Sequence, residues 1–538
     1  MAFEGASPVN TQHVDVLIVG AGLSGIDAAY RLQTECPDKS YAIVEARAAI
    51  GGTWDLFRYP GIRSDSDMST LGFPFEPWDS DVSIADGEAI RSYIQTTASK
   101  YGIDRNIRFG HRVTAADWCS EASRWTVTCE TADTTTTWTC DFLYACSGYY
   151  DYTAGYTPEF PQVEDFAGQM VHPQHWPADL DLTGKRVVVI GSGATAITLI
   201  PSLVGQAEHV TMLQRSPSFV VNLPRVDAVA GKLRRVLPRR TAGSLTRWKN
   251  IFLSMYFYQY ARRRPDDTRS KILHFAQKQL GDDIDANTHF NPSYKPWDQR
   301  LCIAPGGDLF RALRKGKASI VTDHIEQFTP SGIKTRSGEH IDADVVVTAT
   351  GLVIQLFGGA ALSVDGEAVS TAEKLIYKGM MLDGVPNFAF AFGYTNASWT
   401  LKCDLTAQYV CRLLNRMSRR GETACVPERD ASVEPELMVD LDSGYIQRAK
   451  NVMPLQGTQA PWRVHQNYVL DLAATKLSRI DDGAMQFRTA ASRSTAASTS
   501  TVAESSGPVR GRRQPSAAHS AERWTSIRTH ARRRRLLR

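Results

Sequence analysis

The sequence lacks the usual features of a secreted or membrane-spanning protein. Its nine cysteines include no C-x-x-C pair and no pattern typical of a disulfide framework, so we expect reduced, partly buried thiols in a cytoplasmic protein. The apolar run VDVLIVGAGL is too short to cross a bilayer, and it has neither a preceding basic region nor a cleavage site. Neither secretion nor a membrane span is indicated.

Acidic residues are scarce at the C-terminal end of the chain. Residues 488–538 contain 12 arginines and only two carboxylates, Glu504 and Glu522, whereas residues 1–487 carry a formal net charge of −6. The same stretch is rich in Ser, Thr and Ala, a composition that does not form a packed core. We predict a disordered basic tail over 488–538. Because charge runs are usually solvated and attract phosphate without selectivity, we expect no specific nucleic-acid partner.

With 538 residues the chain is too long for one core, so two or three domains are expected. Two segments repeat the same pattern: VDVLIVGAGLSG (14–25) and KRVVVIGSGATA (185–196). Each is a run of β-branched residues that ends in G-x-G-x-x-G or G-x-G-x-x-A before a helix-compatible stretch. The repeat predicts an α/β protein with two Rossmann-like dinucleotide-binding domains.

An acidic residue follows the first motif where a ribose would lie. Gly20 permits the tight turn, Gly22 lets a pyrophosphate approach the backbone, and Gly25 lets the helix pack on the strand. Ser24 falls at the helix start, where free N–H groups favour phosphate. Glu45, at the end of YAIVE, can accept both hydroxyls of an adenosine ribose. The pattern predicts a dinucleotide with an unphosphorylated ribose, such as FAD or NAD.

The second motif is not followed by such an acid. Gly191, Gly193 and Ala196 repeat the turn, but the matching strand HVTMLQ leads into Arg215 and Ser216. Guanidinium and hydroxyl groups can bind a 2′-phosphate that an acid would repel, so we predict NADPH. The alternative is a solvated arginine at a strand end. A chain that binds FAD and NADPH is expected to pass hydride from one to the other.

The remaining patterns divide the chain into parts. Residues 226–290 show helical spacing of Leu, Arg and aromatic residues, and DADVVVTATG (342–351) is expected to return the chain toward the first cofactor. The predicted parts are an FAD-binding domain (1–148 and 344–487), a linker (149–177), an NADP-binding domain (178–225 and 297–343), a helical insertion (226–296) and the tail (488–538).

The loop GGTWDLFRYPGIRSDSD (51–67) combines glycines, aromatic residues and charges. Arg63, Ser64 and Asp65 could contact a ligand, or the loop could simply pack well and carry a surface ion pair. A flavin that reacts with O₂ forms a C4a-peroxyflavin, whose anionic oxygen needs a dry site beside a fixed positive charge. Arg300, in YKPWDQRLC, is the candidate for that charge, and Asp65 for the carboxylate that orients it. The sequence does not show whether these two side chains meet.

Long stretches resemble the class B flavin monooxygenases, in particular the type I Baeyer–Villiger monooxygenases. They lie between residue 10 and about residue 485 and include GGTWDLFRYPGIRSDSDM, CSGYY, VIGSGATA, PWDQRLC and GYTNASWTLK. The family fingerprint F-x-G-x-x-x-H-x-x-x-W-P is matched by Phe166, Gly168, His172, Trp176 and Pro177. The resemblance implies NADPH-dependent insertion of one oxygen of O₂ beside a ketone carbonyl, which gives an ester or lactone, and oxidation of sulfur in thioethers or thioamides.

The resemblance and the glycine motifs together assign roles to individual residues. The expected catalytic residues are Arg300 and Asp65. Residues expected to contact FAD are Gly20, Gly22, Ser24, Gly25, Glu45, Thr53, Trp54, Asp55, Leu56, Asp65 and Val113. Residues expected to contact NADP are Arg63, Ser64, Asp65, Gly191, Ser192, Gly193, Ala194, Thr195, Ala196, Ile197, Arg215 and Ser216. Many members of the family have Lys before the catalytic arginine; Gln299 stands here, so selectivity for NADPH is expected to depend more heavily on Arg215.

Other functions fit parts of the sequence. A flavin monooxygenase that acts mainly on sulfur or nitrogen needs the same oxygenating chemistry, so the residues do not separate it from a ketone oxygenase. A disulfide reductase would need a redox cysteine pair, and no cysteines have that spacing. A nucleic-acid or membrane-binding protein is suggested by the tail and by basic runs at 234–240 and 261–265. The expected partners are O₂ and a ketone or sulfur-containing small molecule.

Two further segments allow more than one interpretation. In DFAGQMVHPQHWP (165–177), Pro173 breaks the helix that would bring two histidines together, so we expect a linker anchored by His172 and Trp176 and not a metal site. The segment RWKNIFLSMYFYQYARRR (247–264) could contact a membrane surface or an apolar substrate, but we expect it to pack in the core.

Overall fold

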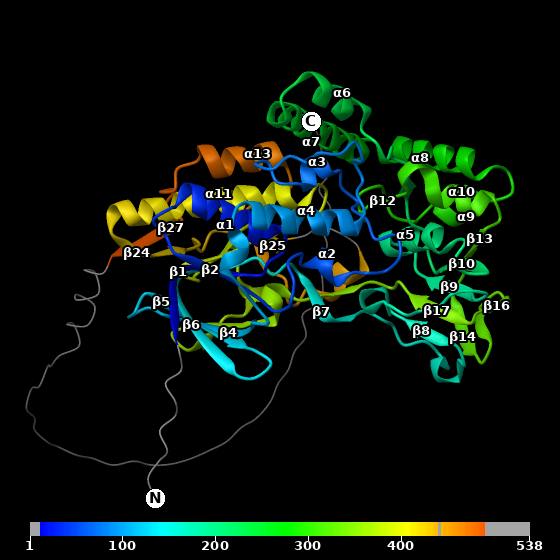
Figure 1. Ribbon diagram of the computed structural model, residues 1–538, viewed down its shortest axis with the longest axis horizontal. Helices are drawn as coiled ribbons and strands as arrows, with labels where there is room; N and C mark the ends of the chain where they lie inside the picture. The colour runs from blue at the N-terminus through cyan, green and yellow to red at the C-terminus, as the bar shows by residue number, and fades with distance from the viewer. Residues whose placement is uncertain (1–10, 439–442, 490–538) are drawn as a thin grey trace, which may run out of the picture. The chain divides into compact units, whose positions relative to one another are not determined.

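The first glycine motif opens the larger of two main sheets (Figure 1). In the computed structural model, which describes residues 11–438 and 443–489, β1 (Gln12–Val19) pairs in parallel with β2 (Tyr41–Glu45) and β6 (Thr135–Ala145). The sheet has nine strands in the order β20-β19-β4-β5-β6-β1-β2-β3, with β23 paired to β6. Its other strands are β3 (Ile107–Phe109), β4 (Arg112–Cys119), β5 (Arg124–Glu130), β19 (Ala361–Val364), β20 (Glu367–Ala368) and β23 (Phe388–Phe390).

Both faces of β1 are buried, which explains its unbroken apolar sequence. Val16 and Ile18 pack against helices, whereas Leu17 points to the opposite face, toward β4, β5 and β6, because successive side chains of a strand alternate. The helices are α1 (Leu23–Glu35), α4 (Gly87–Lys100) and α11 (Trp399–Arg420), which lie along one face of the sheet (Figure 1). The sequence pattern of residues 86–101 predicts a helix, and the structure forms it as α4, with Asp86 as its N-cap.

The second glycine motif opens a smaller, fully parallel sheet. Its order is β13-β10-β9-β17-β8, so the motif strand β9 is central and its neighbours bury it. The strands are β8 (Gln169–Val171), β9 (Arg186–Ile190), β10 (His209–Gln214), β13 (Ala318–Thr322) and β17 (Val345–Thr348). One face packs on α5 (Ala194–Leu203), α8 (Pro265–Leu280), α9 (Ala286–Phe290) and α10 (Asp308–Arg314). The opposite face packs on a meander of β14 (Ile325–Thr329), β15 (Gly332–Thr335) and β16 (His340–Asp342).

The sheet pairing differs from two of the predicted segment limits. β8 lies inside the predicted linker 149–177, and β17 lies inside the predicted FAD segment 344–487, yet both strands pair in the second sheet. The chain returns to the first sheet only after β17, where β18 (Leu352–Ile354) pairs with β7 (Tyr150–Gly155) and β19 pairs with β4. Two strands of the second sheet come from segments far apart in the sequence. Sequence composition alone does not show that such strands pair, so it could not place these limits. The predicted domain limits as such stay a prediction.

The helical insertion expected at 226–296 contains α6 (Ala228–Val236), α7 (Arg239–Arg263), α8 and α9. The expectation that 247–264 packs in the core was wrong for most of its aromatic face. Ile251 is buried, but Phe252, Tyr256 and Phe257 each expose more than half of their surface. The helical period identifies such a face, but it does not show whether another element covers it.

The residues of the fingerprint segment hold several strands together. The backbone N–H of Gln174 donates to His172 Nδ1 at 3.2 Å, and the imidazole ring packs against Gly155 of β7. The Gln174 side chain donates to the carbonyl of Asp151 at 2.8 Å, and Trp176 packs on the core of the second sheet. These contacts join the segment before the second sheet to β7, which leads out of the first.

The remaining elements are short and complete the layers. The helices are α2 (Thr53–Leu56), α3 (Met68–Leu71), α12 (Gly444–Arg448) and α13 (Tyr468–Leu472). The strands are β11 (Val220–Val221), β12 (Cys302–Ile303), β21 (Ile376–Tyr377), β22 (Met381–Leu382), β24 (Glu422–Pro427), β25 (Pro435–Leu437), β26 (Leu455–Gly457) and β27 (Met485–Thr489).

The predicted tail begins inside a strand, because β27 continues to Thr489 and pairs with β24. The rest of the tail, 490–538, lies outside the described residues, so its disorder stays a prediction. All nine cysteines are free thiols, eight of them buried. Within the described ranges, no helix is both long and apolar enough to cross a membrane.

Candidate active site

A cavity of about 440 Å³ opens where β1 and β2 end. Its walls come from the β1–α1 turn, the loop after residue 50, the start of β4, residues 146–153 and the segment before α11. A volume of this size is in the range of roughly 300–1,000 Å³ found for ligand sites. The predicted site residues that line it are Gly20, Gly22, Ser24, Glu45, Thr53, Trp54, Arg63, Ser64, Asp65, Val113 and Arg300.

The floor of the cavity is a turn that accepts only glycine. Gly20 has a φ of +105°, and a Cβ there would lie 2.8 Å from the carbonyl oxygen of Cys146. A Cβ on Gly25 would lie 1.9 Å from the carbonyl oxygen of Gly20. Gly22, the N-cap of α1, has no side-chain cap, so the first N–H groups of the helix are directed to the cavity. This cradle fits a phosphate group.

Glu45 lies at the end of β2, where the sequence placed it, and its side chain is buried. Its two carboxylate oxygens accept the backbone N–H groups of Ala21 at 2.7 Å and of Arg47 at 2.8 Å. Burial raises the pKa of Glu45, against those two hydrogen bonds, which lower it. The contact with Ala21 ties the acid to the glycine turn, and further lone pairs of the carboxylate remain to accept hydroxyl groups.

Asp65 and Arg300, 235 positions apart in the sequence, line the same cavity. Burial raises the pKa of Asp65, while the charges of Arg300 and then Arg63 lower it. Burial lowers the pKa of Arg300, but Asp65 and the neighbouring tyrosines raise it above its usual value, so the guanidinium stays charged. Among the described residues, no carboxylate lies within 4 Å of the Arg300 guanidinium. Its N–H groups are thus available to a ligand.

The two other polar residues of the loop have structural partners. Arg63 donates to Asp308 Oδ2 at 2.6 Å and to the carbonyl oxygen of Ile303 at 3.2 Å. The ion pair therefore joins the loop to α10 beside the second sheet, and it is largely buried, in contrast to the surface pair considered above. The Ser64 hydroxyl donates to the carbonyl of Ser66 at 2.7 Å. Both contacts hold Asp65 in place.

An aromatic wall that the sequence did not assign to the site lines one side of the cavity. Trp399 Nε1 donates to the Ser24 hydroxyl at 2.9 Å, and its ring stacks on Tyr149 at a centroid distance of 5.1 Å. Tyr149 and Tyr150 share a hydrogen bond of 2.8 Å between their hydroxyls. Tyr152 lies within 3.3 Å of the Thr53 hydroxyl. Most of these rings lie in the stretches CSGYY and GYTNASWTLK, which also carry the family resemblance. These two stretches could therefore have indicated the aromatic wall.

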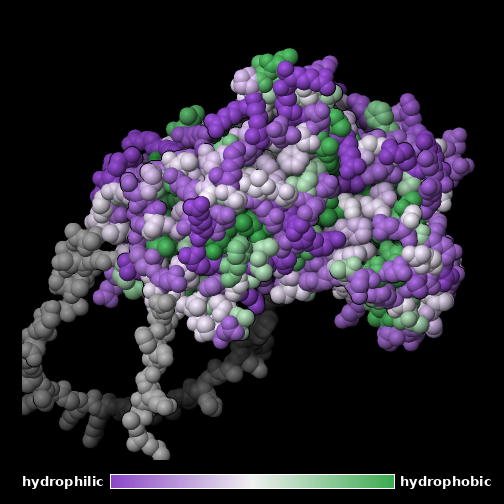
Figure 2. Space-filling model, in the orientation of Figure 1, coloured by the Kyte–Doolittle hydropathy of each residue, from purple (hydrophilic) through white to green (hydrophobic). Residues whose placement is uncertain are grey.

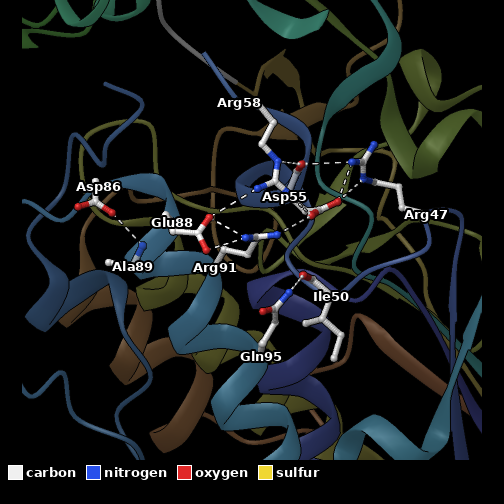
Figure 3. A network of polar contacts seen from close by, with 9 residues as sticks. All are labelled: Arg47, Ile50, Asp55, Arg58, Asp86, Glu88, Ala89, Arg91 and Gln95. Carbon is white, nitrogen blue, oxygen red and sulfur yellow. Dashed lines mark hydrogen bonds and ion pairs between the residues drawn. The ribbon is translucent and has the colours of Figure 1, made fainter. Parts of the chain in front are cut away.

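Of the residues expected to contact FAD, Gly25 lies behind the turn and does not line the cavity, and neither do Asp55 and Leu56. Figure 3 shows the Asp55 carboxylate between Arg47, Arg58 and Arg91. Arg47 Nη2 lies 2.7 Å from Asp55 Oδ2, and the carboxylate is 6% exposed. Leu56 is buried in the core of the second sheet. Both residues fix the short helix α2, which carries Thr53 and Trp54 to the cavity wall.

The second glycine motif has the same backbone but an open surround. Gly191 has a φ of +139°, and a Cβ there would lie 2.3 Å from the carbonyl oxygen of Ala349. Gly193 is the N-cap of α5 and has no side-chain cap; a Cβ on it would meet nothing within 4 Å. The N–H groups at the start of α5 thus face open space that a phosphate can occupy. Ala196 and Ile197 are fully buried in the core, so they support the turn from below.

Arg215 and Ser216 are exposed directly after β10. Gln214, before them, is buried and donates to the carbonyl oxygen of His289 and to the Thr322 hydroxyl, both at 2.8 Å. The side chain of Gln214 thereby fixes the end of β10. In the described chain, no carboxylate pairs with Arg215, which leaves its guanidinium available to an anion.

The chain belongs to the flavin-binding monooxygenase-like family, whose pattern matches residues 13–247, and it is a flavin-dependent monooxygenase. This confirms the resemblance and the class of enzyme predicted from the motifs. The FAD-containing monooxygenase EthA of Mycolicibacterium smegmatis is 53% identical over 479 residues, which cover 89% of this chain and 97% of that protein. The probable FAD-binding monooxygenase AlmA of Acinetobacter baylyi is 50% identical over 480 residues, 88% of this chain and 96% of that protein.

Solved structures of Baeyer–Villiger monooxygenases share the fold. Oxidized steroid monooxygenase bound to NADP superposes with a TM-score of 0.72 at 23% identity, over 89% of this chain and all of that one. The open structure of cyclohexanone monooxygenase gives a TM-score of 0.68 at 20% identity, with the same coverage. The prediction of an α/β fold with two dinucleotide-binding domains is confirmed, and the prediction of FAD and NADPH as cofactors agrees with these proteins.

Proposed function

We propose that the chain uses FAD, NADPH and O₂ to insert an oxygen atom beside a ketone carbonyl, giving an ester or lactone. The observation that carries this proposal is that Asp65 and Arg300 line one cavity, close enough for their charges to interact. A permanent cation without a protein carboxylate in ion-pair contact suits the stabilisation of negative charge that develops during a reaction. Ketone oxygenation is also the activity named for the cyclohexanone monooxygenases that share this fold.

The residues around the first glycine turn fit FAD. The N–H groups at the start of α1 would hold the pyrophosphate, and Glu45 would accept the ribose hydroxyls. The backbone at Val113 would meet the adenine, while Thr53, Trp54 and Asp65 would line the flavin. When bound, the flavin supplies the reductive activation of O₂. The protein supplies the closed surface and the fixed charges.

The residues around the second turn fit NADPH. The start of α5 would hold the pyrophosphate, and Arg215 with Ser216 would bind the 2′-phosphate by charge-assisted hydrogen bonds. Arg63 and Ser64 would lie toward the nicotinamide end. Arg63 is paired with Asp308 beside the second sheet. Binding of NADPH at that sheet would therefore affect the position of the loop that carries Asp65.

In the proposed reaction, Arg300 binds the carbonyl oxygen of the substrate, and Asp65 orients Arg300. The guanidinium would donate to the substrate carbonyl oxygen and stabilise the negative charge that forms there when the transferred oxygen attacks the carbonyl carbon. A carbon substituent then migrates from the carbonyl carbon to the transferred oxygen. The C–C bond breaks as the C–O bond of the ester forms, the carbonyl re-forms as the O–O bond breaks, and the second oxygen of O₂ leaves as water with the two electrons that NADPH supplies. Asp65 would orient the guanidinium, which makes it a positioning residue.

Oxidation of sulfur in thioethers or thioamides is the second candidate. It needs the same cavity but no stabilised carbonyl oxygen, so its dependence on Arg300 should be weaker. We also infer that the fingerprint segment couples the two sheets, since His172 packs on β7 and Trp176 on the second core. The unpaired, buried thiols favour a reducing compartment, in keeping with a cytoplasmic location.

The test is product analysis with a panel of ketones and thioethers, NADPH and O₂. Esters or lactones formed at rates similar to NADPH consumption would support the proposal. Sulfoxides without any ester would contradict it and favour the second candidate. Consumption of NADPH with release of hydrogen peroxide alone would exclude both.

A further inference from the structure

The second half of α7 presents an apolar face that no other described part of the chain covers. Phe252, Leu253, Tyr256 and Phe257 expose 56%, 48%, 62% and 56% of their surface, and their spacing places them on one side of the helix. We call these four residues the α7 face. Figure 2 shows hydrophobic side chains bordered by hydrophilic ones over the α6–α7 hairpin.

The opposite side of α7 is anchored to the first domain. Ile251 is buried in a small core with Tyr394 and Leu401. Arg247, 7% exposed, donates to the carbonyl oxygens of Ser69, Thr70 and Gly72 at 2.8–3.2 Å. Three hydrogen bonds from one buried guanidinium fix the rotation of the helix, so the α7 face is held outward by the fold.

The charged residues of the α6–α7 hairpin itself are all basic. Residues 228–264 contain ten Lys and Arg and no Asp or Glu, although residues 1–487 as a whole are acidic. Several of these cations are held by carboxylates elsewhere, such as Arg234 by Asp81 and Arg262 by Asp298. Within the described chain, the exposed cations of this stretch without a carboxylate partner are Lys232, Arg235, Arg240, Arg263 and Arg264.

We propose that the α7 face is a docking surface for an anionic lipid membrane. An apolar helix face with rings at the level of lipid headgroups, flanked by unpaired cations and lacking any acid, has the features of a helix that lies in the membrane interface. A second copy of the chain would bring two positive hairpins together, which like-charge repulsion opposes. The apolar face inserts, and the basic residues bind the headgroup phosphates.

The position of the face is also suited to delivery of apolar substrates, an extension that depends on the proposed function. On the opposite side of α7, a hollow of about 10 Å³ is lined by Ile251, Met255 and Tyr258. Tyr394 and Ala397 line both this hollow and the main cavity. Docking would therefore place the lipid against a helix whose inner side borders the wall of the active site.

The experiment is flotation of the full-length holoenzyme with vesicles of equimolar phosphatidylglycerol and phosphatidylcholine. The wild type should float with these vesicles and not with pure phosphatidylcholine. The double variant Phe252→Ser/Phe257→Ser should bind at least about tenfold more weakly, because two large apolar side chains no longer leave water. The matched control is Phe275→Ser in α8, whose ring is 60% exposed outside the α7 face; it should bind like the wild type.

Every variant keeps the C-terminal tail, so the tail contributes equally to each measurement. If the double variant floats as well as the wild type, the α7 face is not the docking surface. If the wild type ignores the vesicles but is a dimer that the double variant dissolves, the face binds a second copy and the proposal is wrong. Unchanged flavin absorbance and melting temperature in the variants exclude misfolding.

A second readout separates docking from catalysis. For a long-chain ketone dissolved in the anionic vesicles, kcat/KM should fall at least about tenfold in the double variant, and it should stay unchanged for a short, water-soluble ketone. Loss of both activities would point to damage of the active site. Normal vesicle binding with no ester from any ketone would leave docking intact and contradict the proposed function.

Discussion

The two glycine motifs have nearly the same backbone, yet they are set in opposite surroundings. The first turn forms the floor of a cavity lined by the loop after residue 50 and the aromatic wall, and the next strand, β2, ends in the buried acid Glu45. The second turn opens outward, and the strand that follows it, β10, leads into the exposed residues Arg215 and Ser216. In both cases the turn provides a phosphate site. The residues at the end of the next strand determine which nucleotide binds, and the surrounding loops determine how readily it dissociates.

The enclosed site suits a cofactor that remains bound, and the open site suits one that must exchange. The two are joined by few side chains. Among the described lining residues of the cavity, Arg300 comes from the segment 178–343 that builds most of the second sheet. The Arg63–Asp308 ion pair links the cavity loop to the same region. The following predictions test this division of roles, beginning with the largest effect.

Removing the charge that the second region contributes should have the largest effect. Arg300→Ala should lower ester formation by at least about 100-fold, as expected for loss of a donor to a developing oxyanion. Its flavin content should equal that of the wild type, because the guanidinium binds no backbone group of the glycine turn. Arg300→Lys, which keeps the charge, should recover part of the rate. Ester formation by Arg300→Ala at the wild-type rate would remove Arg300 from the mechanism.

Replacing the buried acid should weaken the enclosed site. Glu45→Ala loses the acceptor for two ribose hydroxyls and for the N–H of Ala21, so the Kd for FAD should rise about 10- to 100-fold. Fluorescence titration of the deflavinated protein measures this. The KM for NADPH, extrapolated to full flavin occupancy, should stay unchanged. A parallel rise in both constants would show that the two sites are not separate.

Replacing the exposed arginine should affect the open site alone. Arg215→Ala should raise the KM for NADPH about tenfold, because a charge-assisted hydrogen bond to the 2′-phosphate is lost, and leave the KM for NADH unchanged. Steady-state kinetics with both nucleotides decides the matter. Equal effects on both would mean that Arg215 does not read the phosphate.

The pH dependence should report on Asp65. Burial raises the pKa of Asp65 from its usual 3.8, so the anion that orients Arg300 is lost as the pH falls through this raised value. The acidic limb of kcat/KM should therefore lie above the usual value of an aspartate. Arg63→Ala removes a cation that lowers the pKa, so the limb should move to higher pH. A limb that does not move in Arg63→Ala and persists in Asp65→Asn belongs to another group.

The smallest effect on the cofactor is expected at Asp55. Asp55→Asn disrupts the contacts with Arg47 and Arg58, so the free energy of unfolding should fall by about 2 kcal/mol. The Kd for FAD should change less than about threefold, since the carboxylate lies outside the cavity. Glu88→Gln, a 67% exposed member of the same network, is the control and should change neither quantity. A large loss of FAD affinity in Asp55→Asn would show that Asp55 contacts the cofactor after all.

Local patterns predicted the elements that are determined locally. The glycine turns, the strand-end residues and α4 are set by short sequences whose geometry has few alternatives. The ion-pair partner of Arg63 is not, because Asp308 is more than 200 residues away and nothing in the spacing specifies it. For Arg300, the sequence offered Asp65 as a candidate, but only the structure shows that both line one cavity. The prediction that residues 247–264 pack in the core was wrong for a related reason. The sequence of a helix shows which side is apolar, but it does not show whether another element covers that side.

Isotope labelling tests the central claim most directly. With ¹⁸O₂, NADPH and a ketone that the enzyme accepts, mass spectrometry of the ester should show one labelled oxygen, inserted between the carbonyl carbon and the migrated carbon. The label should be absent from the ester fraction of Arg300→Ala, while that variant still consumes NADPH. An unlabelled ester, or labelled ester formed equally by both proteins, would contradict the account.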